Sequence, residues 1–114
     1  MDMSSEKVVL CASNYYNQKF YLNEKFYNLP EQIRQELQIL CVLYTEDVGG
    51  ILELVFDEDG NLSFETSCEE GDFTYDEIGS VLKIKQYCNQ KRELLEAVEM
   101  YYKIMFLGQG FEEE

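Results

Sequence analysis

The chain has 114 residues, of which 46% are apolar, and this fraction is enough for one packed core, so we expect a single domain over residues 1–114. Its net charge of −14 repels nucleic-acid phosphate and anionic lipid, which argues against direct binding of nucleic acid or of a membrane surface. No apolar run approaches the roughly 20 residues that cross a bilayer, and the N-terminus starts acidic where a secretory signal starts basic, so we expect a cytoplasmic protein.

Two strands are expected at the start of the chain. Residues 7–13 are apolar on both faces, which predicts a central strand covered on both sides. Residues 19–22 predict a short second strand that returns beside the first after a turn over residues 14–18. The aromatic residues of this region are Tyr15, Tyr16, Phe20, Tyr21, Phe26 and Tyr27. We expect them to cover one end of the core, because two neighbouring lysines cannot turn them into a base-stacking surface within so acidic a chain.

A first helix is predicted to open at Asn28. The Asn28 side chain and Glu31 form a capping-box pattern, and Pro30 is tolerated in the first turn. The apolar residues that follow at spacings of four, three and four are Ile33, Leu37, Leu40 and Tyr44. This spacing predicts one helical stripe that faces the core.

The second half of this element has two interpretations. Every residue from 39 to 44 is apolar, so a helix here would be buried nearly all round, and Gly49 and Gly50 would end it. Alternatively, residues 39–45 form a strand of their own in a meander with the next hairpin. We favour the helix.

The stretch from residue 51 to residue 67 predicts a β-hairpin. Alternate residues are apolar on both sides of a turn, and this period of two is typical of half-buried strands. The residues assigned to the core face are Leu52, Leu54, Phe56, Leu62 and Phe64, and those assigned to the other face are Glu53, Asp57, Ser63 and Glu65. Gly60 can adopt the positive φ of a type I turn followed by a bulge, so the turn is placed at residues 58–60.

Carboxylates concentrate in the middle of the chain. No basic residue lies between Arg34 and Lys83, whereas two short acidic groups do. The first is Asp57, Glu58 and Asp59 in the hairpin turn, and the second is Glu69, Glu70 and Asp72 in a loop that pivots at Gly71. These charges either keep the protein soluble or meet a basic protein partner.

A long helical pattern begins after Asp76, which can cap its first turn. Its residues at alternating spacings of three and four are Val81, Ile84, Cys88, Lys91, Leu95, Val98, Tyr102 and Met105. One helix over residues 77–107 would be roughly 45 Å long, which exceeds the width of a domain of this size. Either it breaks near residues 89–92, or its first half projects and pairs with the same seam of a second copy. Residues 108–114 are predicted to be a frayed acidic tail.

These elements together predict an α+β fold. The order is strand, strand, helix, strand, strand, helix, and the last helix is either long or broken. An antiparallel sheet of about four strands with its helices packed on one face is the economical arrangement.

The sequence offers little chemistry. There is no histidine, and the four cysteines (Cys11, Cys41, Cys68 and Cys88) are far apart, so we predict no catalytic residue, no metal site and no cofactor, and four reduced, mostly buried thiols. Residues 57–61 superficially match the start of a calcium loop, but Leu62 stands where such a loop needs glycine. Tyr75, Asp76 and Gly79 are noted as residues that could line a pocket.

The segments ELQILCVLYTEDVGGILELVFDEDGNL and YDEIGSVLKIKQ resemble those of a family of small, acidic, uncharacterised bacterial proteins carried as a domain of unknown function. The likeness runs over most of the chain and implies a cytosolic bacterial protein, without bringing an activity, a ligand or a functional residue. The order of elements is also similar to small acidic α+β modules such as toxin-immunity proteins and secretion chaperones, although a fold does not imply a function.

Three hypotheses follow. The first is a non-enzymatic protein-interaction module that binds a basic partner or a second copy of itself. Its candidate surface consists of Val81, Ile84, Cys88, Asp57, Glu58, Asp59, Glu69, Glu70 and Asp72. The second is a small-ligand binder or enzyme with a pocket between sheet and helices, which needs a cavity of roughly 300 Å³ or more. The third is a charge mimic of nucleic acid, which needs carboxylates spaced regularly along one surface.

Overall fold

The computed structural model describes residues 7–108, and its centre is one four-stranded sheet. The strands are β1 (Val8–Asn14), β2 (Lys19–Leu22), β3 (Ile51–Phe56) and β4 (Leu62–Ser67). They lie in the order β2-β1-β3-β4, and every neighbouring pair is antiparallel. The predicted antiparallel sheet is therefore confirmed, with β1 and β3 at its centre.

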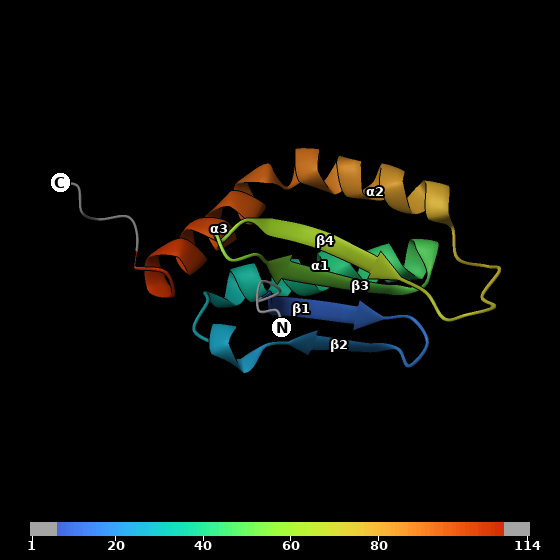
Figure 1. Cartoon of the computed structure of the whole chain (residues 1–114), viewed down its shortest axis with the longest axis horizontal. Coiled ribbons are helices and arrows are strands. Elements are labelled where there is room, and N and C mark those ends of the chain that lie inside the picture. Colours follow the sequence, from blue (N-terminus) through green and yellow to red (C-terminus); the bar gives the residue numbers. More distant parts are fainter. Residues whose placement is uncertain (1–6, 109–114) are drawn as a thin grey trace.

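The helices pack on one face of this sheet. They are α1 (Glu31–Val48), α2 (Glu77–Gln90) and α3 (Arg92–Met105), and a short 3-10 helix, η2 (Glu24–Phe26), follows β2. Figure 1 shows α1 behind the strands, whereas α2 and α3 run one after the other along the β4 side of the sheet. This arrangement confirms the α+β class, and the element order follows the predicted one with the last helix broken in two.

The β3–β4 hairpin is confirmed in register and in turn. Leu54 pairs with Phe64 and Phe56 pairs with Leu62, so the apolar residues of both strands share the core face. The turn closes where the Asp57 N–H donates to the Asn61 carbonyl at 3.0 Å, and Gly60 has φ +87°. On the outer side of β4, the N–H of Leu62 donates to the Glu99 carboxylate of α3 at 2.7 Å.

The α1 helix confirms that residues 39–45 are helical, but its predicted start at Asn28 is wrong. The helix begins at Glu31 with Pro30 as its cap residue, and no side chain caps it. The proline disfavours a helical backbone at the residue before it, so the helix cannot extend back to Asn28. An asparagine does cap a neighbouring turn: Asn23 accepts the N–H of Lys25 at 3.0 Å and opens η2.

The aromatic residues near the N-terminus do not act together as a lid on the core. Phe26 is fully buried and stacks with Phe56 and Tyr102, and its ring also packs at a tilt against Phe106, just past the end of α3. Tyr15, Tyr21 and Tyr27 are exposed instead. The prediction therefore holds for Phe26 and in part for Phe20, which packs against the core. It is wrong for the exposed tyrosines, which lie in the β1–β2 turn, on the exposed side of β2 and after η2.

The long C-terminal pattern breaks at Lys91, which ends α2 and precedes α3 with φ −110° and ψ 28°. Of the two sequence interpretations, the broken helix is therefore correct. The core-facing residues of the two helices are Ser80, Ile84, Tyr87, Leu94, Val98 and Tyr102. The predicted seam shares Ile84, Val98 and Tyr102 with this stripe, but its remaining α2 positions face away from the core.

Of the predicted tail over residues 108–114, all but Gly108 lies outside the described residues. Within residues 7–108, no helix combines the length and the apolar character that a bilayer crossing demands.

Candidate protein-interaction surface

The nine predicted surface residues fall into three separate places. Asp57, Glu58 and Asp59 lie at the β3–β4 turn, which precedes β4, whereas Glu69, Glu70 and Asp72 lie in the loop that follows it. Figure 1 shows these two segments at opposite ends of the hairpin. The remaining three residues lie on α2, where Val81 and Cys88 are exposed and Ile84 packs partly against the core. The structure therefore does not bring the acidic groups together.

Asp57 has a structural role in the hairpin turn. The Asp57 carboxylate accepts the N–H groups of Asp59 and Asn61, each at 2.9 Å. These bonds favour its charged form and lower the pKa of Asp57, with the bond from Asn61 as the largest cause. Glu58 and Asp59 remain exposed.

The acidic loop after β4 is held in place from a distant part of the chain. The hydroxyl of Tyr16, in the β1–β2 turn, accepts the N–H of Glu69 at 3.0 Å and donates to the Asp72 carboxylate. Asp72 also accepts the Thr74 N–H at 2.9 Å and the Thr74 hydroxyl at 2.6 Å. These bonds, that from the Thr74 side chain foremost, lower the pKa of Asp72. The loop thus has a defined shape on both sides of residue 73.

Residue 73 is a phenylalanine with 96% of its surface exposed. Three further apolar residues follow at the start of α2 with large exposed fractions: Ile78 at 77%, Val81 at 59% and Leu82 at 61%. We name these four residues the loop–α2 patch. Large apolar side chains exposed within so short a stretch are typical of protein–protein contact sites.

Sequence reasoning found only Val81 of the loop–α2 patch. Ile78, Leu82 and Lys85 follow one another at spacings of four and three residues, so they form a second stripe on one side of α2. This side lies opposite the one that holds Ser80 and Ile84. This stripe could have been found by asking which apolar residues the core-facing stripe leaves over. Phe73 carries no local pattern, because its exposure depends on the long-range bonds of the loop.

Tyr75, Asp76 and Gly79 have structural roles. Tyr75 lies partly buried beside Gly50, and its hydroxyl donates to the Ser80 hydroxyl at 3.2 Å. The Ser80 hydroxyl is buried and also bonds the hydroxyl of Tyr44. Asp76 caps α2 by accepting the Gly79 N–H at 2.8 Å. This network fixes the start of α2 against α1.

One open groove in the described residues has a volume of about 960 Å³. It lies between the start of α1 and the α2–α3 junction, and not between sheet and helices as the ligand-binding hypothesis assumed. Its lining includes Ile33, Leu94 and Ala97, with charged residues of both signs at Glu36 and Arg92.

Two of the four thiols differ from the prediction. Cys11 and Cys41 are buried, with their Sγ atoms 3.7 Å apart, whereas Cys68 and Cys88 are exposed. Cys68 lies just past the end of β4 and Cys88 on an outer side of α2, so neither is covered. In residues 7–108, no group of three or more cysteine or acidic side chains is arranged to hold a metal ion.

A comparison with known families matches residues 7–110 to the family of unknown function DUF6145. The chain belongs to DUF6145. The resemblance to a domain of unknown function noted in the sequence is thus confirmed, while the bacterial origin it implied stays a prediction. No curated protein and no solved structure matches the chain. Membership of DUF6145 assigns no activity, so a function has to be argued from the surface itself.

Proposed function

We propose that this DUF6145 chain is a non-enzymatic protein-interaction module whose contact site is the loop–α2 patch. The observation that supports this proposal is the 96% exposure of Phe73 on a loop whose flanking residues are both hydrogen-bonded. A fixed backbone reduces the conformational entropy lost on binding, and aromatic anchors are enriched among the residues that dominate binding energy.

The surroundings of the patch suit a protein partner. Glu69, Glu70 and Asp72 precede Phe73, so the apolar residues lie next to a rim of carboxylates. An apolar centre with a charged rim is the usual composition of a specific interface. In such an interface the rim charges mainly favour partners of complementary charge.

The proposal is tested by comparing which proteins the tagged chain retains from its native extract. Phe73→Ser should lose the retained partner, whereas Ile39→Ser, which changes an exposed apolar residue on α1, should keep it. Both variants change exposed side chains, so thermal unfolding should be nearly unchanged in each. Equal retention by Phe73→Ser and by the unaltered chain would refute the proposal.

A second candidate function has one observation in its favour. The groove of about 960 Å³ between α1 and the α2–α3 junction exceeds the minimum size for a small-molecule site. A ligand there would contact Ile33 and Leu94, so Ala97→Trp should fill the groove and abolish any thermal stabilisation by that ligand. A library screen by thermal shift, with Ala97→Trp as the control, distinguishes this candidate from the first.

The charge-mimic hypothesis has less support. Its acidic residues would need to follow one surface, and the two acidic groups lie at opposite ends of β4.

A further inference from the structure

We propose that the partner of the loop–α2 patch is a second copy of this chain, bound through an antiparallel pairing of the two α2 helices about a two-fold axis near Leu82. This inference rests on the proposed interaction function and names the partner. It follows from the exposed apolar residues of α2, from the distribution of charge along the helix, and from the opposite charges that an antiparallel pair brings together.

The first step is the apolar stripe on the outer side of α2. Ser80 and Tyr87 are buried and Ile84 packs against the core, so they define the inner side of the helix. Ile78 and Leu82 are exposed and four residues apart, which places them one above the other on a different side. A stripe of this kind on a helix that already packs on its other side is available to a second helix.

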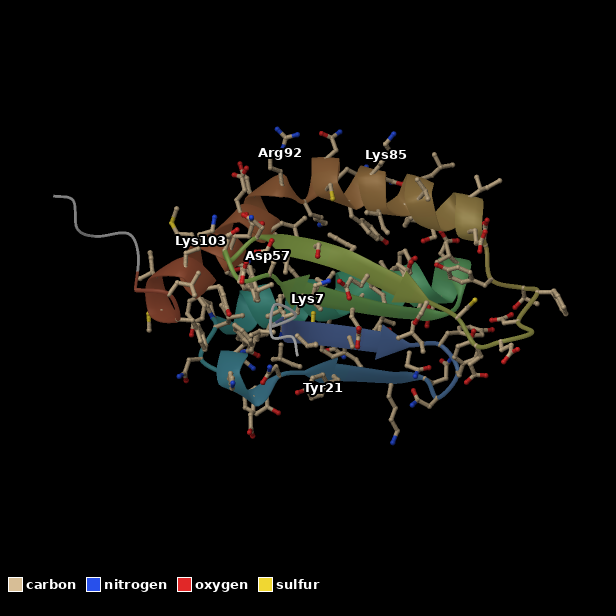
Figure 2. The ribbon with its side chains drawn as sticks, in the orientation of Figure 1. Lys7, Tyr21, Asp57, Lys85, Arg92 and Lys103 are labelled. Carbon is tan, nitrogen blue, oxygen red and sulfur yellow. The ribbon has the colours of Figure 1, made fainter. Side chains whose placement is uncertain are left out.

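The second step is the charge along the helix. Basic residues lie in the second half of α2 and at its junction with α3, where residues 83–92 hold four of the nine in the chain: Lys83, Lys85, Lys91 and Arg92. Lys83 pairs with Asp47 of α1 at 2.7 Å, but Lys85 and Arg92 are exposed. Figure 2 shows both of these side chains pointing away from the sheet, Lys85 from the middle of α2 and Arg92 from the start of α3.

The other end of α2 carries the opposite charge. Glu77 opens the helix, Asp76 caps it and Asp72 precedes it in the loop. Charge therefore changes along α2 from acidic at its start to basic over its second half and the junction with α3, although the whole molecule is strongly acidic.

An antiparallel pair brings these unlike ends together. With the two-fold axis near Leu82, this residue contacts the partner's Leu82, and Ile78 lies on either side of that contact. At 1.5 Å per residue, Lys85 lies about 5 Å from the axis and the partner's Glu77 about 8 Å on the same side, so an ion pair is within side-chain reach. A parallel pair would instead place Lys85 beside the partner's Lys85. Charge thus selects the antiparallel arrangement and a second copy as the occupant.

The size of the contact sets the expected strength. A helix of 14 residues is about 21 Å long, so the pairing buries less than the roughly 800 Å² per partner of a standard interface. We therefore expect a reversible dimer that forms as the concentration rises through the micromolar range. Sedimentation velocity of the full chain should show the mass rising from one copy to two.

Paired variants test the interface. Leu82→Ser should weaken self-association at least tenfold, whereas Leu43→Ser, at an exposed leucine of α1, should leave it unchanged. Lys85→Glu and Glu77→Lys should each weaken self-association, because each creates two like-charge contacts in the symmetric dimer. Mixing these two variants should restore a dimer, since a mixed dimer pairs unlike charges at both positions.

Each result decides the matter. A chain that stays monomeric to about 1 mM, or equal effects of Leu82→Ser and Leu43→Ser, overturns self-association through α2. If the unaltered chain forms dimers but a mixture of the two charge variants does not, the antiparallel arrangement is overturned. If the chain stays monomeric and the Phe73→Ser variant no longer retains a different protein from the extract, that protein is the partner. The interaction function then stands and this inference fails.

Discussion

Gly50 joins α1 to β3 at a position where a side chain has no room. A Cβ there would lie 2.6 Å from the carbonyl oxygen of Ser67 and 2.7 Å from the ring of Tyr75. The backbone also has φ +73°, which L side chains rarely adopt. The residue therefore lets three segments meet: the end of α1, the end of β4 and the segment that leads into α2.

Replacing this glycine should be costly. Gly50→Ala is expected to lower the free energy of unfolding by roughly 2–4 kcal/mol, because the left-handed backbone and the contact with Ser67 both oppose a methyl group. Gly71→Ala is the matched control, since Gly71 has φ +85° but open space around it. Its loss should be about 1 kcal/mol. Urea unfolding of both variants measures the difference, and equal losses would show that the contact is not limiting.

Residues of this kind also show where sequence reasoning ends. Gly49 and Gly50 were correctly predicted to end the first helix, because a helix end commonly needs a positive φ. The close approach of Tyr75 to Gly50 joins residues 25 positions apart, and no local pattern records it. The bond that Tyr16 donates to Asp72 and the one that it accepts from Glu69 were missed for the same reason.

At the scale of elements, the predictions succeeded where a periodic pattern and a turn residue agree. The β3–β4 hairpin combines alternation with Gly60, and its register was obtained correctly. The start of α1 was wrong because the pattern Asn28 to Glu31 fits a capping box in spacing, while Pro30 excludes the required backbone at the residue before it. The predicted seam of the C-terminal helices was wrong over most of α2. Two apolar stripes run through the same stretch of sequence there, and only packing against the rest of the molecule decides which one is buried.

The predicted cap of α2 gives an element-scale test. Asp76 accepts the Gly79 N–H at 2.8 Å, which satisfies one of the amide groups that the first turn leaves without a partner. Asp76→Ala should therefore lower the free energy of unfolding by about 1 kcal/mol. Asp76→Asn should retain most of it, because the amide oxygen can accept the same bond.

The measurement is chemical denaturation of the three proteins in parallel. Identical midpoints for the alanine and asparagine variants would show that the side-chain bond contributes nothing.

At the scale of the whole molecule, one core joins all the layers. It includes Leu37 from α1, Phe56 from β3, Tyr87 from α2 and Val98 from α3. A structure in which each element contributes to the same core should unfold cooperatively. Three tyrosines belong to this core, of which the apolar patterns had included Tyr44 and Tyr102 but not Tyr87.

Those tyrosines predict a dependence of stability on alkaline pH. Burial raises the pKa of Tyr44, Tyr87 and Tyr102 above the ordinary value. A raised pKa in the folded state means that their contribution is fully present below the unfolded value of about 10 and is lost as the pH rises above it. The urea midpoint should fall between pH 9 and pH 11. Tyr44→Phe should show a shallower fall than the unaltered chain, and equal slopes would contradict the assignment.

The contact between Glu99 and Leu62 bears on how the molecule avoids fibrous aggregation. Strands recruit further strands through unpaired amides along a sheet border, and an indefinite stack requires two open borders. Here the carboxylate from α3 occupies the first outward amide of β4, on the side where the helices run. A strand that pairs at the β4 border therefore has to displace this carboxylate first, and one that pairs at the β2 border finds a strand of only four residues.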